Sequence, residues 1–242
     1  MAACDSFIIT CEHGGNRIPP RYRPLFRGQD AMLRTHRGYD PGALLMAREL
    51  AGALRAPLVS ATVSRLLVDL NRSLGHPRLF GDATRGAPAT VRAAIVDQHY
   101  RPYRAEVERL VRKAIARGRR VVHVSSHSFT PELDGKVRRA DVGLLYDPAR
   151  RGEAALCGRW KAALATSAPE LMVRRNYPYA GKGDGLTSYL RRQFAPELYV
   201  GIELEVNHGI VLAGGRRWTA LRGTLIESLR KGLRIKSRTG EQ

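Results

Sequence analysis

The chain has 242 residues, of which 43% are hydrophobic and 26% are charged. This composition is typical of one globular domain and excludes an intrinsically disordered chain. The formal net charge of +19 would by itself favour a nucleic-acid or membrane-surface partner. The basic residues are spread along the whole chain, however, so we interpret them as solvated surface charge and expect no nucleic-acid partner. No stretch approaches the roughly 18 apolar residues of a membrane span, and we expect no membrane partner.

Short apolar runs alternate with longer stretches of helical period, which is typical of an α/β sandwich with a buried central sheet. The runs predicted as strands are residues 6–11, 57–61, 66–70, 120–125, 142–146 and 198–206. The stretches predicted as helices are residues 42–54, 88–117, 152–166, 187–193 and 218–231. Pro102 lies inside the second of these stretches, where we expect a break in the helix.

The cysteines and the N-terminal segment indicate the compartment. Cys4, Cys11 and Cys157 contain no Cys-x-x-Cys pair and cannot all pair with one another, which favours a reducing environment. The N-terminus shows no basic region followed by a long apolar run. We therefore expect a cytoplasmic protein.

Two polar motifs in the first third of the chain are candidates for a site. His13 follows the first predicted strand and precedes two glycines, which would place an imidazole at the carboxyl edge of the sheet, where open α/β folds bind ligands. The second motif contains Arg65, Asp69, Asn71 and Arg72, beside an apolar run. Charged groups there are costly unless paired, and Arg72 has the geometry to bind a substrate carboxylate. An ion pair between Arg65 and Asp69 is the structural alternative.

Two later strands also carry polar residues. His123 and His127 share one face of a strand, but His127 lies at the strand end, so we predict His127 as a metal ligand and His123 as a core residue. Glu203 and Glu205 also share one face of a late apolar strand. Because an unpaired buried carboxylate is costly, we expect at least one of them to be functional, for example as a general base.

Six short motifs follow one another in order along most of the chain. They are Glu12-His13-Gly14-Gly15-Asn16 with Pro19; His36 with Asp40-Pro41-Gly42-Ala43; Ser64-Arg65-Leu66 with Asp69 and Asn71-Arg72; His127-Ser128-Phe129-Thr130-Pro131; Asn176-Tyr177-Pro178-Tyr179; and Glu203. In these motifs together the sequence resembles the N-formylglutamate amidohydrolase family, and more remotely the aspartoacylase and zinc carboxypeptidase group. The resemblance implies a single domain over residues 1–242, a phosphorylase/hydrolase-like three-layer α/β/α sandwich with a mixed, mostly parallel sheet.

The resemblance also implies a function and a role for each site residue. The expected reaction is the zinc-dependent hydrolysis of N-formyl-L-glutamate to formate and glutamate by a cytoplasmic enzyme of amino-acid catabolism, with one zinc per chain. His13 and His127 would be zinc ligands, Arg65 would polarise the scissile carbonyl, and Glu203 would be the general acid and base. The residues expected to bind the substrate are Asn71, Arg72, Asn176 and Tyr179.

The third metal ligand is open, because the sequence departs from the carboxypeptidase group. That group has a Glu ligand three residues after its first His, whereas this chain has Asn16, a poor zinc ligand. Asp40 is the first choice, with helix capping as its structural alternative. Glu12 is the second choice, because strand alternation points it away from His13 unless the chain turns there.

Two other functions are compatible with the sequence. A related zinc amidase or carboxypeptidase would act on other N-acyl amino acids or on short peptides, including cell-wall fragments. A catalytically inactive relative would bind polyanions through the net charge of +19, since the usual Glu ligand is replaced by Asn16.

Overall fold

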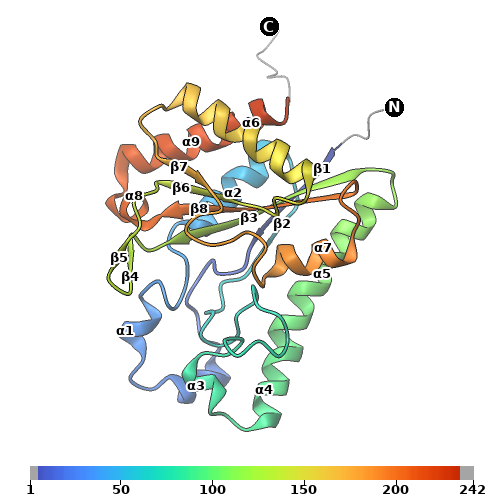
Figure 1. The fold of residues 1–242 in the computed structure, drawn as a ribbon. Helices are drawn as coiled ribbons and strands as arrows, with labels where there is room; N and C mark the ends of the chain where they lie inside the picture. The colour runs from blue at the N-terminus through green and yellow to red at the C-terminus, as the bar shows by residue number, and fades with distance from the viewer. Residues whose placement is uncertain (1–4, 235–242) are drawn as a thin grey trace, which may run out of the picture.

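The computed structural model describes residues 5–234 and has a six-stranded mixed sheet at its centre (Figure 1). Its strands are β1 (Asp5–Cys11), β2 (Leu58–Ser60), β3 (Arg120–Phe129), β6 (Val142–Leu145), β7 (Val173–Arg175) and β8 (Tyr199–Asn207). The strand order is β2-β1-β3-β8-β6-β7. Strands β1, β2, β3 and β8 run parallel, whereas β6 is antiparallel to β8 and parallel to β7. The prediction of a mixed, mostly parallel sheet is confirmed.

Helices cover both faces of the sheet. Helices α2 (Ala43–Leu54), α6 (Arg151–Ser167) and α9 (Gly215–Gly232) pack on one face, and α5 (Arg101–Ile115) and α7 (Leu186–Gln193) pack on the other (Figure 1). The short elements are η1 (Pro20–Phe26), α1 (Asp30–Leu33), α3 (Asp82–Arg85), α4 (Ala89–Ile95), η2 (Val96–Tyr100), α8 (His208–Ala213) and the hairpin β4 (Glu132–Leu133) with β5 (Lys136–Val137). This arrangement confirms the three-layer α/β/α fold.

The central strands are apolar on both faces because each face is covered by helices. Neighbouring residues of one strand point to opposite faces, so Ile8 and Val121 belong to the hydrophobic cluster on the α5 side, while Ile9 and Val122 belong to the cluster on the α2 side. Strands buried on both faces read as continuous apolar runs, which is why the sequence identified them. The sheet is therefore a rigid support for side chains at its carboxyl edge.

The predicted strand at residues 66–70 is wrong. The segment forms turns instead, and its backbone pairs with a neighbouring loop: the Asp69 N–H donates to the Leu79 carbonyl at 2.8 Å, and the Gly81 N–H donates to the Leu66 carbonyl at 3.1 Å. Leu67 and Val68 are buried in the cluster on the α5 side. The error arises because a short apolar run can be buried either as a strand or as an irregular segment, and the sequence pattern does not separate the two.

The predicted helix at residues 88–117 does not break at Pro102, but its hydrogen-bond pattern changes along its length. It consists of α4, the π-helical turn η2 and α5, which follow one another directly, and Pro102 lies in the first turn of α5. A π-helical turn just before a proline adjusts the hydrogen-bond ladder that the proline cannot join. The other predicted helices agree with α2, α6, α7 and α9 to within a few residues at each end.

Two features of the structure concern the predicted environment of the chain: the character of its helices and the state of its cysteines. Within residues 5–234, no helix combines the length and the apolar character that crossing a bilayer requires. Cys11 and Cys157 are buried free thiols, and Cys4 lies outside the described residues.

Candidate functional site

Three residues from distant parts of the chain converge at the carboxyl edge of the sheet. His13 follows β1, Asp40 precedes α2, and His127 lies near the end of β3. All three are buried, and one ligand atom from each lies within 4.8 Å of the others. Nδ1 of His13 and Nδ1 of His127 face the same Asp40 oxygen, Oδ2, at 3.3 Å and 2.9 Å. We call these three residues the histidine–aspartate cluster.

Local backbone contacts place the first two members. A Cβ on Gly14 or Gly15 would lie 2.9 Å or 2.7 Å from the carbonyl oxygens of the chain beyond β2, so the turn after His13 requires glycine for this close approach. The Asp40 N–H then donates to the His13 carbonyl at 2.9 Å. The N-cap of α2 is Gly42 and no side chain caps the helix, so the Asp40 carboxylate is not used for helix capping.

Each imidazole is also held on its outer side by a carboxylate. Nε2 of His13 lies 2.7 Å from Oδ1 of Asp69, and Nε2 of His127 lies 3.0 Å from Oε2 of Glu12. With the proton on Nε2 donated outward, the Nδ1 lone pair points inward, which is the usual arrangement of metal-binding histidines. Two imidazole nitrogens and one carboxylate oxygen form a donor set that fits zinc with an open position.

Glu12 lies behind His127 and holds its imidazole from the outer side. It is fully buried and accepts hydrogen bonds from the Tyr103 hydroxyl at 2.9 Å and the Ser125 hydroxyl at 2.5 Å. Burial alone would raise the pKa of Glu12, but its hydrogen bond to His127 and the charge of that residue outweigh this and hold the pKa well below its usual range. The same contact and the Asp40 carboxylate raise the pKa of His127 against the effect of burial. Of the two choices for a third ligand, the structure brings Asp40 to the inner side.

Asn16, the residue at the usual Glu ligand position, points elsewhere. Its Nδ2 donates to the Leu33 carbonyl at 3.1 Å, so the amide ties the turn after β1 to the end of α1. With Asp40 beside both histidines, the cluster has three donors without a residue at this position.

Arg65 lies between two aspartates at the rim of the cluster. Its Nη1 donates to Asp40 Oδ1 at 3.2 Å and its Nη2 to Asp69 Oδ2 at 2.8 Å. Burial would lower the pKa of Arg65, but Asp69 and Asp40 raise it above its ordinary value. The Arg65–Asp69 ion pair considered from the sequence is therefore present, and Asp69 also orients His13.

The two glutamates of β8 lie beside β3 in parallel register. Ser125 pairs with Glu203, and His127 pairs with Glu205. Oε1 of Glu203 accepts a hydrogen bond from the Thr187 hydroxyl at 2.6 Å. Among the described residues, Oε2 of Glu205 is one of two buried side-chain atoms without a hydrogen-bond partner, and burial raises the pKa of Glu205 to about 8. Both carboxylates face the same cavity as the histidine–aspartate cluster, as their alternation predicted.

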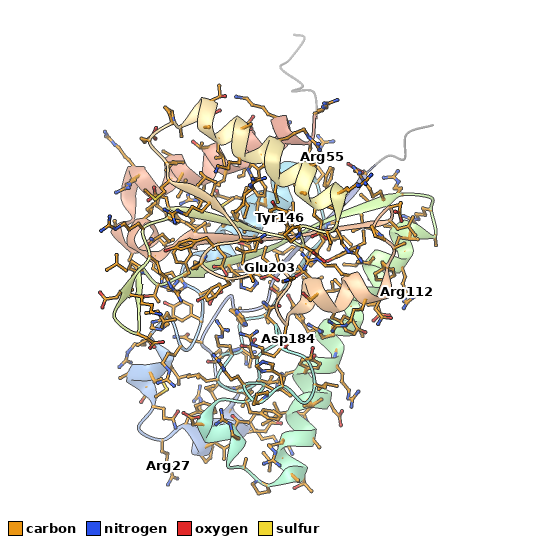
Figure 2. All side chains as sticks on the ribbon, in the orientation of Figure 1. Arg27, Arg55, Arg112, Tyr146, Asp184 and Glu203 are labelled. Carbon is orange, nitrogen blue, oxygen red and sulfur yellow. The ribbon has the colours of Figure 1, made fainter. Side chains whose placement is uncertain are left out.

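This cavity has a volume of about 400 Å³, and we call it the cluster cavity. Asn71, Arg72 and Tyr179 line it together with the cluster, Arg65 and both glutamates. The loop before α7 closes one side: the Arg72 guanidinium donates to the Asp184 carbonyl at 2.9 Å, and Oδ1 of Asn71 accepts from the Leu186 N–H at 2.6 Å. Figure 2 shows Glu203 at the sheet and Asp184 below it.

Asn176 does not line the cluster cavity. Its Oδ1 accepts hydrogen bonds from the backbone N–H groups of Tyr146 at 2.9 Å and Gly181 at 3.2 Å. The side chain thus shapes the loop that carries Tyr179, whose hydroxyl accepts from Arg138 at 2.9 Å. The structure thus places Asn176 outside the cluster cavity, where it supports the loop behind Tyr179, and its expected role in substrate binding stays a prediction.

His123 is separate from the cluster, as the sequence predicted. It is fully buried between the Thr10 hydroxyl at 2.8 Å and the Tyr199 hydroxyl at 2.6 Å. Burial lowers the pKa of His123 to about 4.

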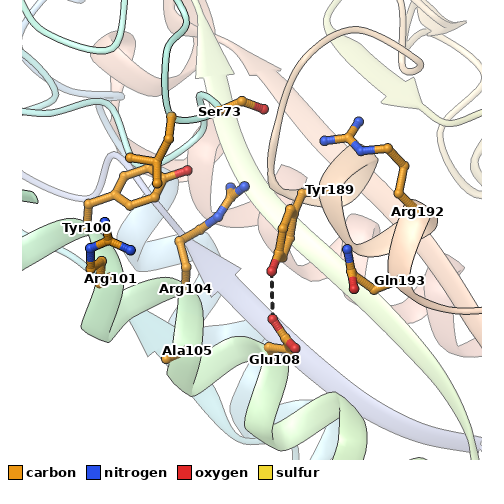
Figure 3. Close-up of a pocket in the computed structure, with 10 residues that line it drawn as sticks. Ser73, Tyr100, Arg101, Arg104, Ala105, Glu108, Tyr189, Arg192 and Gln193 are labelled. Carbon is orange, nitrogen blue, oxygen red and sulfur yellow. Dashed lines mark hydrogen bonds between the residues drawn. The ribbon is translucent and has the colours of Figure 1, made fainter.

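A larger cavity of about 530 Å³ lies elsewhere, between α5 and α7 (Figure 3). The Arg104 guanidinium lies over the rings of Tyr100 and Tyr189, and the Tyr189 hydroxyl donates to Glu108 at 2.7 Å. None of the three cluster residues lines this cavity. The cluster cavity, though smaller, is therefore the candidate active site.

Sequence reasoning missed several residues of the site. Asp184 holds Ser73 through its carboxylate, and a Cβ on Gly185 would lie 2.9 Å from Oδ1 of Asn71, so both keep the loop close to the cavity. Arg78 lines the cavity as well. The glycines around Asp184 were a signal of an unusual loop, but no local pattern pointed to Arg78.

Comparisons with known proteins find a matching family model and similar solved structures. The family model of N-formylglutamate amidohydrolase matches residues 5–212. The gene product Atu2144 from Agrobacterium tumefaciens has a similar structure with a TM-score of 0.82 and 31% identity, over 96% of this chain and 92% of that chain. N-formylglutamate amidohydrolase from Ralstonia eutropha JMP134 shares the fold with a TM-score of 0.67 and 18% identity, over 96% of this chain and 95% of that chain.

A search among curated proteins finds no match. The family model nevertheless spans most of the chain, and the match to Atu2144 is nearly full-length. The chain therefore belongs to the N-formylglutamate amidohydrolase family, which supports its prediction as an amidohydrolase.

Proposed function

We propose that this protein is a zinc-dependent amidohydrolase that hydrolyses N-formyl-L-glutamate to formate and L-glutamate. The observation that carries the proposal is the convergence of His13, Asp40 and His127 in the wall of a cavity that also contains two carboxylates and several arginines. Family membership supports the reaction class. The buried free thiols of Cys11 and Cys157 are compatible with a cytoplasmic location.

The histidine–aspartate cluster would hold the zinc ion, one per chain. A zinc ion with three protein ligands and an open position activates water and polarises an amide carbonyl as a Lewis acid. Glu12 and Asp69 would keep the imidazoles of His127 and His13 in the orientation and tautomer required for binding.

Glu203 would move the proton. One of its oxygens is fixed by Thr187, which leaves the other oxygen to accept a proton from the attacking water and to deliver it to the leaving amine. Glu205 is the competing candidate, since its unpartnered oxygen faces the same cavity and lies beside His127 in the sheet.

The positive groups of the cavity would bind and polarise the substrate. The Arg65 guanidinium stays charged beside Asp40 and Asp69, so it would stabilise the negative charge that develops on the acyl oxygen. Arg72 and Asn71 would bind the carboxylate of the substrate, with Tyr179 on the opposite loop closing the cavity. Both Arg72 and Asn71 are held in place by the loop before α7.

The decisive experiment combines elemental analysis of protein purified without chelators with an assay of formate release from N-formyl-L-glutamate. Wild type is expected to contain about one zinc per chain and to release formate. Asp40→Ala removes the shared inner carboxylate, so it should lose both zinc and activity.

Asn16→Ala is the matched control, because Asn16 lies on the same turn as His13 but bonds only to the Leu33 carbonyl among the described residues. It should retain zinc and activity. Metal-free, inactive wild type from zinc-supplemented cells would overturn the proposal. Zinc-loaded wild type that cleaves other N-acyl amino acids, but not N-formyl-L-glutamate, would overturn the substrate assignment alone.

A further inference from the structure

A second cavity of about 290 Å³ adjoins the cluster cavity, and we call it the arginine cavity. Three residues line both cavities: Arg65, Arg72 and Arg78. The two spaces therefore adjoin at these arginines: the histidine–aspartate cluster lines the inner space, and the segment around α3 lines the outer one. The cluster cavity alone is large enough for a small N-acyl amino acid.

The arginine cavity has an excess of positive charge. Five arginines line it, Arg37, Arg65, Arg72, Arg78 and Arg85, against the two aspartates Asp69 and Asp82. Asp82 is shared by Arg85 at 3.3 Å and Arg37 at 3.9 Å, and Asp69 is already bound to Arg65 and His13. Within residues 5–234, Arg72 and Arg78 form no ion pair with a carboxylate.

His36 does not reduce this excess. It lines the same cavity, and burial together with the charges of Arg37 and Arg65 lowers its pKa, which favours the neutral ring at neutral pH. Phe80 provides an apolar surface in the same wall. The cavity is thus suited to a flexible chain that ends in a carboxylate.

The arginine cavity differs from other basic surface of this chain by its connection to the site. Arginines also line a cavity beside η1, among them Arg17, Arg23 and Arg27, but that cavity shares no lining residue with the cluster cavity. In the arginine cavity, by contrast, Arg72 and Arg78 lie at the boundary between the two spaces. A carboxylate bound at this boundary would leave the next group of the substrate facing Arg37 and Arg85.

We propose that the arginine cavity binds a second anionic group on the amine side of the substrate, so that the site also accepts N-acyl peptides and prefers those whose second residue is acidic. This inference rests on the proposed amide hydrolysis and specifies the substrate class of the same site. Arg72 and Arg78 bind the inner carboxylate, and Arg37 and Arg85 bind the outer one.

The test uses two substrates that differ by a single charge at equal size, N-formyl-L-glutamyl-L-glutamate and N-formyl-L-glutamyl-L-glutamine. Wild type should cleave the glutamate peptide with about tenfold higher kcat/KM, the value of one charge-assisted contact. The double variant Arg37→Gln/Arg85→Gln should reduce this ratio toward one. Asp82→Asn should increase the ratio, because it frees both guanidinium groups.

Arg216→Gln is the matched control, since Arg216 is exposed on α9 at the other face of the sheet, and it should keep the wild-type ratio. Titration calorimetry with L-glutamyl-L-glutamate and L-glutamyl-L-glutamine measures the same preference without hydrolysis. Equal kcat/KM and equal affinity for both members of each pair would overturn the inference. A retained affinity ratio without formate release from any substrate would instead contradict the proposed hydrolysis and leave the anionic subsite supported.

Discussion

Strand β3 carries one histidine in its middle and one at its carboxyl end, and the pKa values of the two are shifted in opposite directions. His123 lies in the middle of the sheet between two hydroxyl groups, and burial lowers its pKa to about 4. His127 is equally buried at the strand end, but Asp40 and Glu12 raise its pKa. The desolvation of the two rings is alike, so the neighbouring carboxylates decide the difference.

The same contrast distinguishes the candidate site from the rest of the sheet. Side chains in the middle of a parallel sheet meet other strands, whereas those at the carboxyl ends meet loops that carry polar groups from distant segments. Asp40 and Glu12 reach His127 in this way. Histidine identity and burial therefore do not distinguish the two positions, whereas the convergence of carboxylates at the strand end does.

The largest expected effect is the difference in zinc content and activity between variants of the two histidines. His127→Ala should lose its zinc and reduce formate release by more than about 100-fold, because even an outer partner of a metal ligand contributes ~10- to 100-fold. His123→Ala should keep both properties in the folded fraction but lower the free energy of unfolding by about 2 to 4 kcal/mol, through a cavity and lost hydrogen bonds. Elemental analysis, formate assays and urea unfolding measure these effects. Zinc lost from His123→Ala and retained in His127→Ala would reverse the comparison.

A smaller effect is expected when the two glutamates of β8 are compared in the same way, through the kcat of their glutamine variants. Glu203→Gln should lower kcat by roughly 10²- to 10⁴-fold, the usual contribution of a general acid or base, with the zinc content unchanged. Glu205→Gln should have a much weaker effect, because the pKa of Glu205 is raised to about 8 and glutamine resembles its protonated form. If Glu205→Gln shows the larger loss of kcat, the proton-transfer role belongs to Glu205.

The smallest expected effect is the pH dependence of stability in metal-free protein. The lowered pKa of His123 contributes stability above pH 6.5 that is lost as the pH falls toward 4. The raised pKa of His127 contributes stability below pH 6.5 that is lost as the pH rises through its folded-state value. In urea unfolding with chelator, His123 should therefore contribute a loss of about 2 to 3 kcal/mol as the pH falls from 6.5 toward 4, and His127 a loss as the pH rises above 6.5. The raised pKa of Glu205 adds a separate loss of stability as the pH rises toward 8, so the two histidines are compared through their variants.

His123→Gln keeps hydrogen-bonding groups but cannot titrate, so it should flatten the acid side of this profile and leave the alkaline side unchanged. His127→Gln should do the opposite. Identical pH profiles for the two variants would show that the carboxylates around His127 do not distinguish the two positions.

The sequence was sufficient for the layers of the fold and for most of the residues that meet in the cluster cavity. Buried parallel strands are continuous apolar runs and helices have their own period, so both can be recognised locally. His13, His127 and Glu203 were identified because polar groups at the end of an apolar strand are unusual. Local signals failed at residues 66–70, where an apolar run is buried without forming a strand.

Only the tertiary structure decided how these residues are paired. The bond between His13 and Asp69 spans 56 positions, that between Asp40 and His127 spans 87, and that between Glu12 and Ser125 spans 113. No local pattern contains such contacts, which is why the sequence favoured Asp40 as the third ligand but left Glu12 open as a second choice, and why Asn16 suggested a missing ligand. The amino-acid types set the chemistry available to the site, and the folding of loops from distant segments over the strand ends determines which donors face inward.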